Sequence, residues 1–134
     1  MDKKKVLIVD DEETVTKSLA MLLNDEYDVK AFTTHTCGVD SLKWLQENNV
    51  DYAIVDLLIN GVSGIDITNA LLQKEKRARI MIITGCSTDS KEYERAKEMT
   101  INNFNVKMCN KPFNDEGEKF TSIIRKDLNE HIAA

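Results

Sequence analysis

Val6-Leu7-Ile8-Val9-Asp10-Asp11-Glu12 is the stretch that decides the fold, because a short apolar run is followed at once by acidic residues. An apolar run this short is typical of a strand that is buried on both faces of a parallel sheet. The same pattern recurs at 53–55, which Asp56 follows, and at 80–83, which Thr84 follows. We therefore predict three inner strands, each ending at a polar residue.

Two further segments alternate between apolar and polar residues, as half-covered edge strands do. They contain Tyr27, Val29 and Ala31 in one case and Val106 and Met108 in the other. Between the strands, apolar residues recur in stripes at helical spacing. These stripes are Val15, Leu19, Leu22 and Leu23; Val39, Leu42 and Leu45; Ile67, Ala70 and Leu71; Tyr93 and Ala96; and Phe120, Ile123, Ile124 and Leu128. Strands that alternate with helices predict a doubly wound α/β domain with a parallel sheet.

Length and composition limit the possible functions. The chain has 134 residues and an apolar content of 42%, which suit one domain with a real core. A net charge of −5, with 3–5 as the only basic run, argues against direct nucleic-acid binding, which needs a concentrated basic stripe. Neither a signal peptide nor an apolar stretch of roughly 18 residues for a membrane span is present. We predict a single domain over residues 1–134 with no membrane contact.

The cysteines give information on the cellular compartment. Cys37, Cys86 and Cys109 are widely spaced and form no C-x-x-C pair. Such cysteines are typical of reduced thiols in a cytoplasmic protein. His35 and His131 do not supply the ligand cluster of a zinc site. We therefore predict a cytoplasmic protein without structural zinc.

Reactive side chains stand at the predicted strand ends. Asp10 and Asp11 follow the first strand, Asp56 the third, Thr84 the fourth and Lys111 the fifth. Because the carboxyl ends of parallel strands meet at one edge of a sheet, these side chains should converge. Carboxylates so close together favour a divalent cation, and oxygen ligands with room for water suit Mg²⁺. An aspartate at such a site can attack phosphorus, while a lysine and a hydroxyl bind phosphate oxygens, so the pattern indicates phosphoryl transfer.

The chain resembles a response-regulator receiver domain of two-component signalling. The resemblance runs from Val6-Leu7-Ile8-Val9-Asp10-Asp11-Glu12 to Lys111-Pro112-Phe113 and covers essentially the whole chain. It implies a flavodoxin-like fold, with five parallel strands in the order 2-1-3-4-5 and helices on both faces. Gly64, eight residues after Asp56, matches the turn of this family into its third helix.

The resemblance also implies how a metal ion is held. Asp11, Asp56 and the backbone carbonyl of Leu58 would bind Mg²⁺ directly. Asp10 would reach the ion through water. The implied cofactor is therefore Mg²⁺, bound at the same edge of the sheet as the phosphoryl group.

The implied function is that of a phosphoryl-activated switch. Asp56 would accept a phosphoryl group from a sensor histidine kinase or a phosphotransfer protein, Lys111 would contact the phosphate, and Thr84 would be the switch hydroxyl. The chain would catalyse only its own phosphorylation and dephosphorylation, so it is not expected to be an enzyme in the ordinary sense. Its output would be a changed protein-binding face, whose effector the sequence does not name.

Several positions depart from the family pattern. Asn60 stands where a proline is usual, and Met108 stands where an aromatic residue is usual. The segment from Thr84 to Lys111 spans 27 positions, which is longer than usual, and the excess falls in 100–105. We therefore expect an enlarged loop before the fifth strand. We also expect the response to phosphorylation to lie more in that loop than in side-chain packing at Met108.

Two positions bear on the lifetime of the phosphoryl group. Leu58 and Cys86 lie two residues beyond Asp56 and Thr84, at positions that set this lifetime in the family. Neither side chain holds a water molecule well, so we expect a long-lived phosphoryl group. A packing role for Cys86 is favoured over redox sensing, because nothing in the sequence indicates a depressed pKa for this thiol.

Other functions remain as alternatives. An aspartate-dependent phosphatase would need a D-x-D motif at the first strand, which 10–12 does not fit. A flavin carrier would need a glycine-rich phosphate loop, and 11–16 contains no glycine. A receiver that only binds partners would be expected to lose site residues that this chain keeps. The last predicted helix ends near His131, and the sequence does not decide between a complete single-domain regulator and part of a larger protein.

Overall fold

The computed structural model describes residues 3–59, 61–85, 90–111 and 117–131. Its main sheet has five parallel strands in the order β2-β1-β3-β6-β7. These strands are β1 (Lys5–Val9), β2 (Asp28–Phe32), β3 (Tyr52–Asp56), β6 (Arg79–Thr84) and β7 (Val106–Asn110). In chain order this is the predicted 2-1-3-4-5 arrangement, so the flavodoxin-like fold is confirmed.

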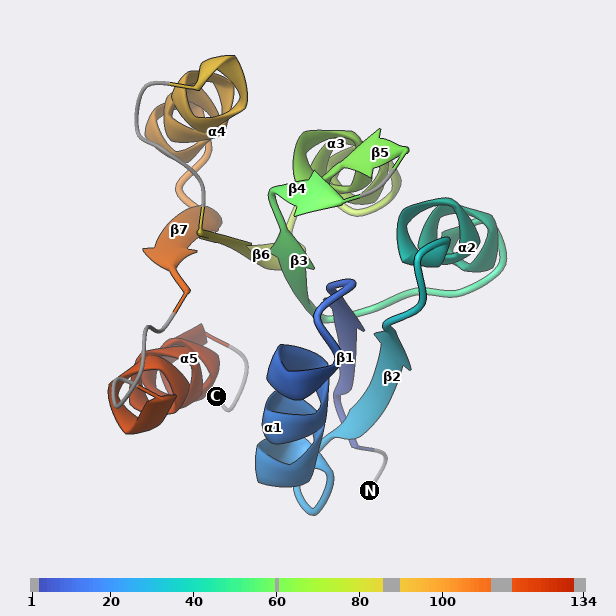
Figure 1. Ribbon diagram of the computed structural model, residues 1–134, viewed down its shortest axis with the longest axis vertical. Helices are drawn as coiled ribbons and strands as arrows, with labels where there is room; N and C mark the ends of the chain where they lie inside the picture. The colour runs from blue at the N-terminus through green and yellow to red at the C-terminus, as the bar shows by residue number, and fades with distance from the viewer. Residues whose placement is uncertain (1–2, 60, 86–89, 112–116, 132–134) are drawn as a thin grey trace.

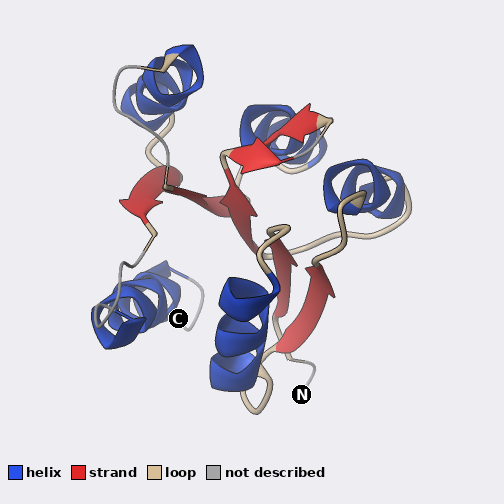
Figure 2. Cartoon of the chain, in the orientation of Figure 1, coloured by secondary structure: helices blue, strands red, loops and turns tan. Residues whose placement is uncertain are grey.

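Five helices cover the two faces of this sheet (Figure 1, Figure 2). They are α1 (Glu13–Leu23), α2 (Cys37–Leu45), α3 (Gly64–Lys74), α4 (Lys91–Asn102) and α5 (Gly117–His131). Helices α1 and α5 lie on one face, and α2, α3 and α4 lie on the other. No helix among the described residues is long and apolar enough to cross a membrane.

The first strand shows why the core has two halves. Its side chains alternate between the two faces of the sheet. Val6 and Ile8 pack with Leu19 on the side of α1 and α5. Leu7 and Val9 belong to the cluster on the side of α2, α3 and α4. All of these side chains are fully buried, as expected of an inner strand with helices on both faces.

Helix α2 buries only part of the predicted stripe, since Leu45 lies in the core and Leu42 packs against it but Val39 does not. Val39 is 41% exposed, and the buried residues of this helix include Cys37, Gly38 and Ser41. A Cβ atom added at Gly38 would lie 3.0 Å from the Cβ of Val62, so the missing side chain permits close packing. The Ser41 hydroxyl donates to the Gly38 carbonyl at 2.8 Å, so this buried hydroxyl has a hydrogen-bond partner in the core. The stripe prediction was therefore right for Leu42 and Leu45 and wrong for Val39, because small residues rather than a large apolar one face inward at the start of the helix.

The prediction of an enlarged loop before the last strand was wrong. Helix α4 continues to Asn102, so only 103–105 connect it to β7. Asn103 closes the helix, because its backbone N–H donates to the Met99 carbonyl at 2.9 Å and its side-chain amide to the same oxygen at 3.1 Å. The side chain of Asn105 donates to the Ala78 carbonyl at 2.6 Å. Asparagine side chains therefore fix a short connection where the sequence suggested a long one.

A short antiparallel hairpin, which the sequence analysis did not predict, follows β3. It pairs β4 (Leu58–Ile59) with β5 (Val62–Ser63), and Gly61 at its turn has a positive φ of 82°. Ser63 then caps α3 in a capping box with Asp66. Asn60, at the position of the usual proline, lies outside the described residues. The hairpin leads the chain from the end of β3 directly into the start of α3.

Candidate functional site

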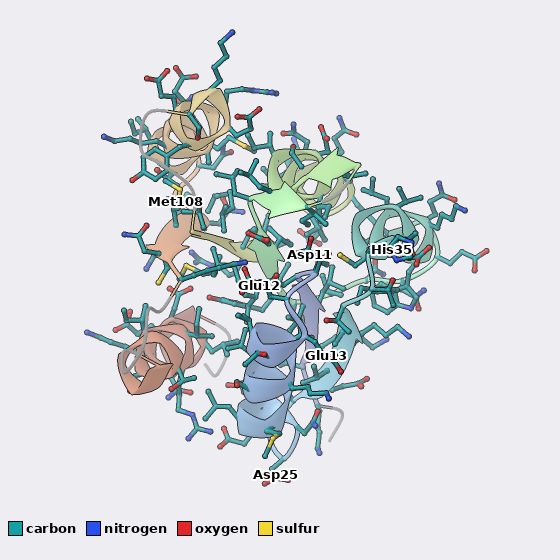
Figure 3. The ribbon with its side chains drawn as sticks, viewed as in Figure 1. Asp11, Glu12, Glu13, Asp25, His35 and Met108 are labelled. Atoms are coloured by element: carbon teal, nitrogen blue, oxygen red, sulfur yellow. The ribbon has the colours of Figure 1, made fainter. Side chains whose placement is uncertain are left out.

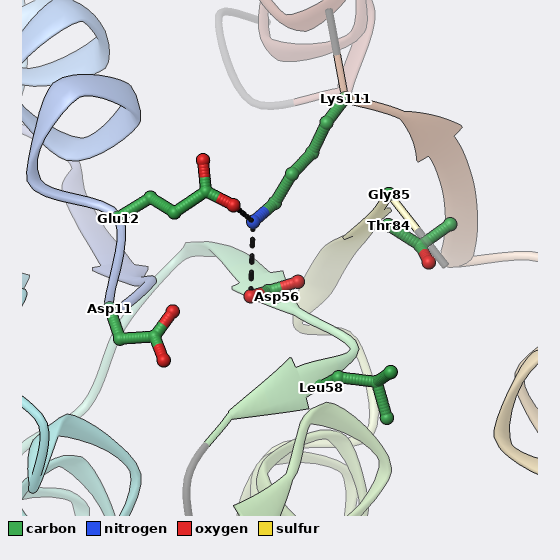
Figure 4. A pocket seen from close by; sticks show the side chains of 7 residues that line it. All are labelled: Asp11, Glu12, Asp56, Leu58, Thr84, Gly85 and Lys111. Atoms are coloured by element: carbon green, nitrogen blue, oxygen red, sulfur yellow. Dashed lines mark hydrogen bonds and ion pairs between the residues drawn. The ribbon is translucent and has the colours of Figure 1, made fainter. Parts of the chain in front are cut away.

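The predicted reactive residues meet at the carboxyl edge of the main sheet. Asp10 and Asp11 follow β1, Asp56 ends β3, Thr84 ends β6 and Lys111 follows β7. A pocket of about 260 Å³ opens at this edge (Figure 4). It is lined by Asp11, Glu12, Asp56, Leu58, Thr84, Gly85 and Lys111. Parallel pairing of the strands explains this convergence of residues that are far apart in the sequence.

Lys111 is the centre of the charge network. Its Nζ lies 2.9 Å from Oε1 of Glu12, 3.1 Å from Oδ2 of Asp56 and 3.2 Å from Oδ1 of Asp10. The lysine side chain is 8% exposed, whereas that of Glu12 is 60% exposed. Sequence reasoning missed Glu12 as a site residue. Its only signal was its place as the third acidic residue after the first strand.

Burial changes the protonation of these groups. Desolvation and the nearby charge of Asp10 raise the pKa of Asp56 from 3.8 to about 7, although Lys111 opposes the change. Desolvation also raises the pKa of Asp10. Burial alone would lower the pKa of Lys111, but Glu12, Asp10 and Asp56 together raise it. Lys111 therefore stays charged, while Asp56 gains or loses a proton near neutral pH.

Three carboxylates form a cluster that could hold a metal ion. Oxygen atoms of Asp10, Asp11 and Asp56 all lie within 4.8 Å of one another. Asp10 is fully buried, and its Oδ2 accepts no well-directed hydrogen bond from the described residues although Lys111 Nζ lies 3.1 Å away. A buried carboxylate oxygen without such a donor fits a cation or its bound water. Oxygen-only donors of this kind suit a hard divalent cation.

The backbone of Asp56 is held by β6 and by the start of α3. The N–H of Leu57 donates to the Ile83 carbonyl at 2.8 Å, and the N–H of Gly64 donates to the Leu57 carbonyl at 2.9 Å. A Cβ atom added at Gly64 would lie 2.4 Å from the Asp56 carbonyl oxygen and 3.0 Å from its carbon. Only glycine therefore lets α3 begin this close to Asp56.

We expect Gly64→Ala to destabilise the fold, because the added methyl group meets backbone rather than a movable side chain. Overpacking of this kind costs about 1–3 kcal/mol, which urea unfolding would measure. Gly85→Ala is the control, since its Cβ would meet nothing closer than Lys111 Cδ at 3.7 Å. Equal stability of the two variants would contradict the packing argument.

The remaining predicted positions have distinct surroundings. Thr84 is 1% exposed at the pocket wall, and its carbonyl accepts a hydrogen bond from the Lys111 backbone at 2.8 Å. Leu58 is 48% exposed and lines the pocket. Met108 is half-buried against the core on the α4 side of the sheet. Cys86 lies outside the described residues.

Comparison with protein families identifies the class of protein that this fold and site define. Residues 6–116 match the response regulator receiver domain. The chain therefore belongs to the response regulator receiver domain family, which places it among the signalling proteins of two-component systems.

Two curated relatives are similar over part of their length. Response regulator UvrY of Escherichia coli is 30% identical over 79 residues, which are 59% of this chain and 36% of UvrY. Response regulator GacA of Pseudomonas aeruginosa is 29% identical over 85 residues, or 63% of this chain and 40% of GacA. The match thus covers less than half of each relative.

Solved structures share the fold over nearly the whole chain. The signal receiver domain of an HD domain-containing protein from Pseudomonas fluorescens has a TM-score of 0.72 at 20% identity, over 98% of this chain and 99% of that one. Response regulator TrrA from Thermotoga maritima, solved with Mg²⁺ and BeF, has a TM-score of 0.64 at 24% identity, over 93% of this chain and 99% of that one. At these identities the likeness establishes the fold.

Proposed function

We propose that this chain is a Mg²⁺-dependent phosphoacceptor whose Asp56 receives a phosphoryl group from a sensor histidine kinase or a phosphotransfer protein. The observation that carries the proposal is the placement of Asp56. Asp56 is 4% exposed and lines the pocket, and its carboxylate contacts Lys111 at 3.1 Å and lies in a cluster with Asp10 and Asp11. Nucleophile, cation-binding carboxylates and a fixed positive charge are therefore within reach of one reacting group.

Each side chain has a defined part in the proposed transfer. An oxygen of Asp56 attacks phosphorus, so that a new O–P bond replaces the P–N bond of the donor phosphohistidine and the histidine nitrogen leaves with the electron pair. Lys111, which stays charged, exchanges its contact with Asp56 for one with a phosphoryl oxygen. Thr84, which ends the neighbouring strand β6 and lines the same pocket, donates its hydroxyl to another phosphoryl oxygen.

The carboxylate cluster supplies the proposed metal site. Asp11, Asp56 and the carbonyl of Leu58 would bind the ion directly, and Asp10 would act through water. When bound, Mg²⁺ offsets the negative charge of the carboxylates and of the phosphoryl oxygens. The complex of TrrA with Mg²⁺ and BeF supports this choice of ion, because that protein shares the fold of this chain.

The proposal also covers the partners of the chain and its location in the cell. Similarity to response regulators supports signalling between a kinase and a downstream effector, with no reaction catalysed beyond the chain's own phosphorylation and dephosphorylation. We include in the proposal that residues 1–134 form one receiver domain and act in the cytoplasm. Free thiols at Cys37 and Cys109 are in keeping with that compartment.

The direct test is incubation of the chain with acetyl phosphate, with and without Mg²⁺, followed by intact mass measurement. We expect the mass of one phosphoryl group to be added only with Mg²⁺ present, and hydroxylamine to remove it. Peptide mapping should place the group on Asp56. Modification at another residue would contradict the proposal.

Leu58 should control how long the phosphoryl group survives. Its side chain lines the pocket and offers no hydrogen bond to an attacking water molecule. We expect Leu58→Asn to hydrolyse about tenfold faster, which corresponds to about 1.4 kcal/mol in the barrier. The measurement is the decay of phosphorylated protein after donor removal at fixed Mg²⁺. Val39→Asn is the control, because Val39 is 41% exposed on α2, outside the pocket. Equal decay in the two variants would mean that Leu58 does not limit access.

A further inference from the structure

At the edge of the sheet opposite Asp56, an exposed aromatic side chain contacts a basic one, and further exposed apolar and basic residues are close to them in sequence. Phe104 is 81% exposed and Ile101 is 75% exposed, just before the start of β7. The guanidinium of Arg79, the first residue of β6, lies 5.1 Å from the centre of the Phe104 ring. Lys76 and Arg77 precede it in the connection from α3. These five residues are called the basic–apolar surface below.

Hydrogen bonds hold this surface in a fixed arrangement. The side chain of Asn105 donates to the Lys76 carbonyl at 3.0 Å and to the Ala78 carbonyl at 2.6 Å. It thereby ties the connection between α4 and β7 to the connection between α3 and β6. A pocket of about 380 Å³ adjoins the surface at Lys76, and Asn103, next to Phe104 in the sequence, also lines it. Its other lining residues are Asn69, Leu72 and Gln73.

The charge of this region contrasts with that of the chain. The net charge of the chain is −5, yet the segment 74–79 contains four basic residues and one acidic residue, which is a local charge of +3. A search for consecutive basic residues missed this segment because Glu75 and Ala78 interrupt it. Lys74 is already engaged, since its ammonium donates to the carbonyls of Leu45 and Asn48.

Lys76 and Arg77 are exposed and available for a partner, whereas Arg79 is half-buried and stacks on the Phe104 ring. Among the side chains that the structure describes, no carboxylate forms an ion pair with Lys76, Arg77 or Arg79. Glu75 accepts a hydrogen bond from the backbone N–H of Arg77 at 2.9 Å, not from its guanidinium. Cations without a carboxylate partner, close to a large exposed aromatic residue, fit a ligand that is both acidic and apolar.

We propose that the basic–apolar surface binds an acidic peptide segment of a partner protein, which carries an aromatic or aliphatic side chain between its carboxylates. The apolar side chain would pack against Phe104 and Ile101, and the carboxylates would pair with Lys76, Arg77 and Arg79. Amide side chains in the adjoining pocket offer hydrogen bonds to the peptide backbone. This proposal does not rest on phosphorylation of Asp56, since the surface lies at the other edge of the sheet.

The surface fits nucleic acid less well than it fits a peptide. Three cations on a chain of net charge −5 would give a polyanion little electrostatic attraction. Ile101 exposes an aliphatic side chain, which makes no favourable contact with a phosphate backbone. Both features favour a short acidic peptide, whose few charges match the few cations.

The test is selection of a display library of random short peptides against the intact chain, followed by fluorescence anisotropy with the most enriched peptide. We expect enrichment of Asp and Glu around an apolar residue. Phe104→Ser, and separately Lys76→Gln with Arg77→Gln, should each weaken binding by about tenfold. Met21→Ser is the apolar control, because Met21 is 80% exposed on α1. Lys3→Gln with Lys4→Gln is the charge control, and both controls should bind like the parent.

Several results would overturn the proposal. They are no enrichment, enrichment of basic or uncharged peptides, undiminished binding by Phe104→Ser, and equal losses in the control variants. Tighter binding of a labelled oligouridine than of the selected peptide would assign the surface to nucleic acid instead. Loss of structure is not expected in any variant, because all of the changed side chains are exposed.

Discussion

Asp56→Asn should abolish phosphorylation by acetyl phosphate and Mg²⁺, because an amide does not attack phosphorus as a carboxylate does. The two side chains are nearly the same size, so the fold should persist. Intact mass is the measurement, and circular dichroism serves as the control for folding. Phosphorylation of this variant at the rate of the parent would show that another residue is the acceptor.

The same substitution should raise the stability of the metal-free protein at neutral and higher pH. The pKa of Asp56 is raised from 3.8 to about 7 in the folded state, chiefly by desolvation. Between these values the folded protein keeps a proton that the unfolded chain has lost, so stability falls as pH rises through this window. Asparagine does not titrate and avoids that loss.

The difference in unfolding free energy between Asp56→Asn and the parent should therefore depend on pH. It should be near zero at about pH 4 and should grow to about 4 kcal/mol above pH 7, since each unit of pKa difference corresponds to about 1.4 kcal/mol. Urea unfolding across this range without metal is the measurement. Mg²⁺ should reduce the difference, because a cation favours the ionised carboxylate. A difference that stays constant with pH would contradict the raised pKa.

Asp11→Asn should weaken Mg²⁺ binding by at least about tenfold, which corresponds to about 1.4 kcal/mol. Asp11 is the exposed member of the carboxylate cluster, and its loss removes a direct ligand from the proposed site. Amide NMR shifts during a Mg²⁺ titration would give the affinity. They report directly on binding and do not depend on phosphorylation.

Asp25→Asn is the matched control for that experiment. It makes the same chemical change on an exposed residue just beyond α1, and Figure 3 shows Asp25 at the opposite end of that helix from Asp11. Long-range attraction to the protein's net charge would be reduced equally in both variants. Equal Mg²⁺ affinity in Asp11→Asn and Asp25→Asn would exclude Asp11 as a ligand.

The structure changes one expectation about the response to phosphorylation. The sequence analysis assigned that response to an enlarged loop at 100–105, but 100–102 belong to α4 and only 103–105 form the connection. Asn103 and Asn105 hold the remaining connection by hydrogen bonds to backbone carbonyls. A rearrangement of this connection would have to break these hydrogen bonds. A flexible loop before β7 therefore does not explain the structural response to phosphorylation.

The sequence by itself determined the sheet and the place of the site. Runs such as 6–9 and 80–83 are apolar on both sides, which only inner parallel strands require, and polar residues follow them directly. Once the strands are parallel, Asp10, Asp56 and Thr84 must share one edge. The order of apolar and polar residues along each element shows which of its positions are buried. The hydrophobic pattern was therefore enough to predict the strands and the edge at which their polar residues meet.

Only the tertiary structure decided which side chains touch. Glu12 contacts Lys111 at 2.9 Å although 99 positions separate them, and α3 begins against Asp56 because Gly64 has no side chain. The inward face of α2 likewise depends on its packing against β5, which leaves no room for a large side chain at position 38. Gly38 is therefore buried while Val39 is exposed. These contacts join elements whose relative positions are set by short connections and close packing. Periodicity within one element carries no information about them, because it reports whether a residue is buried and not what it is buried against.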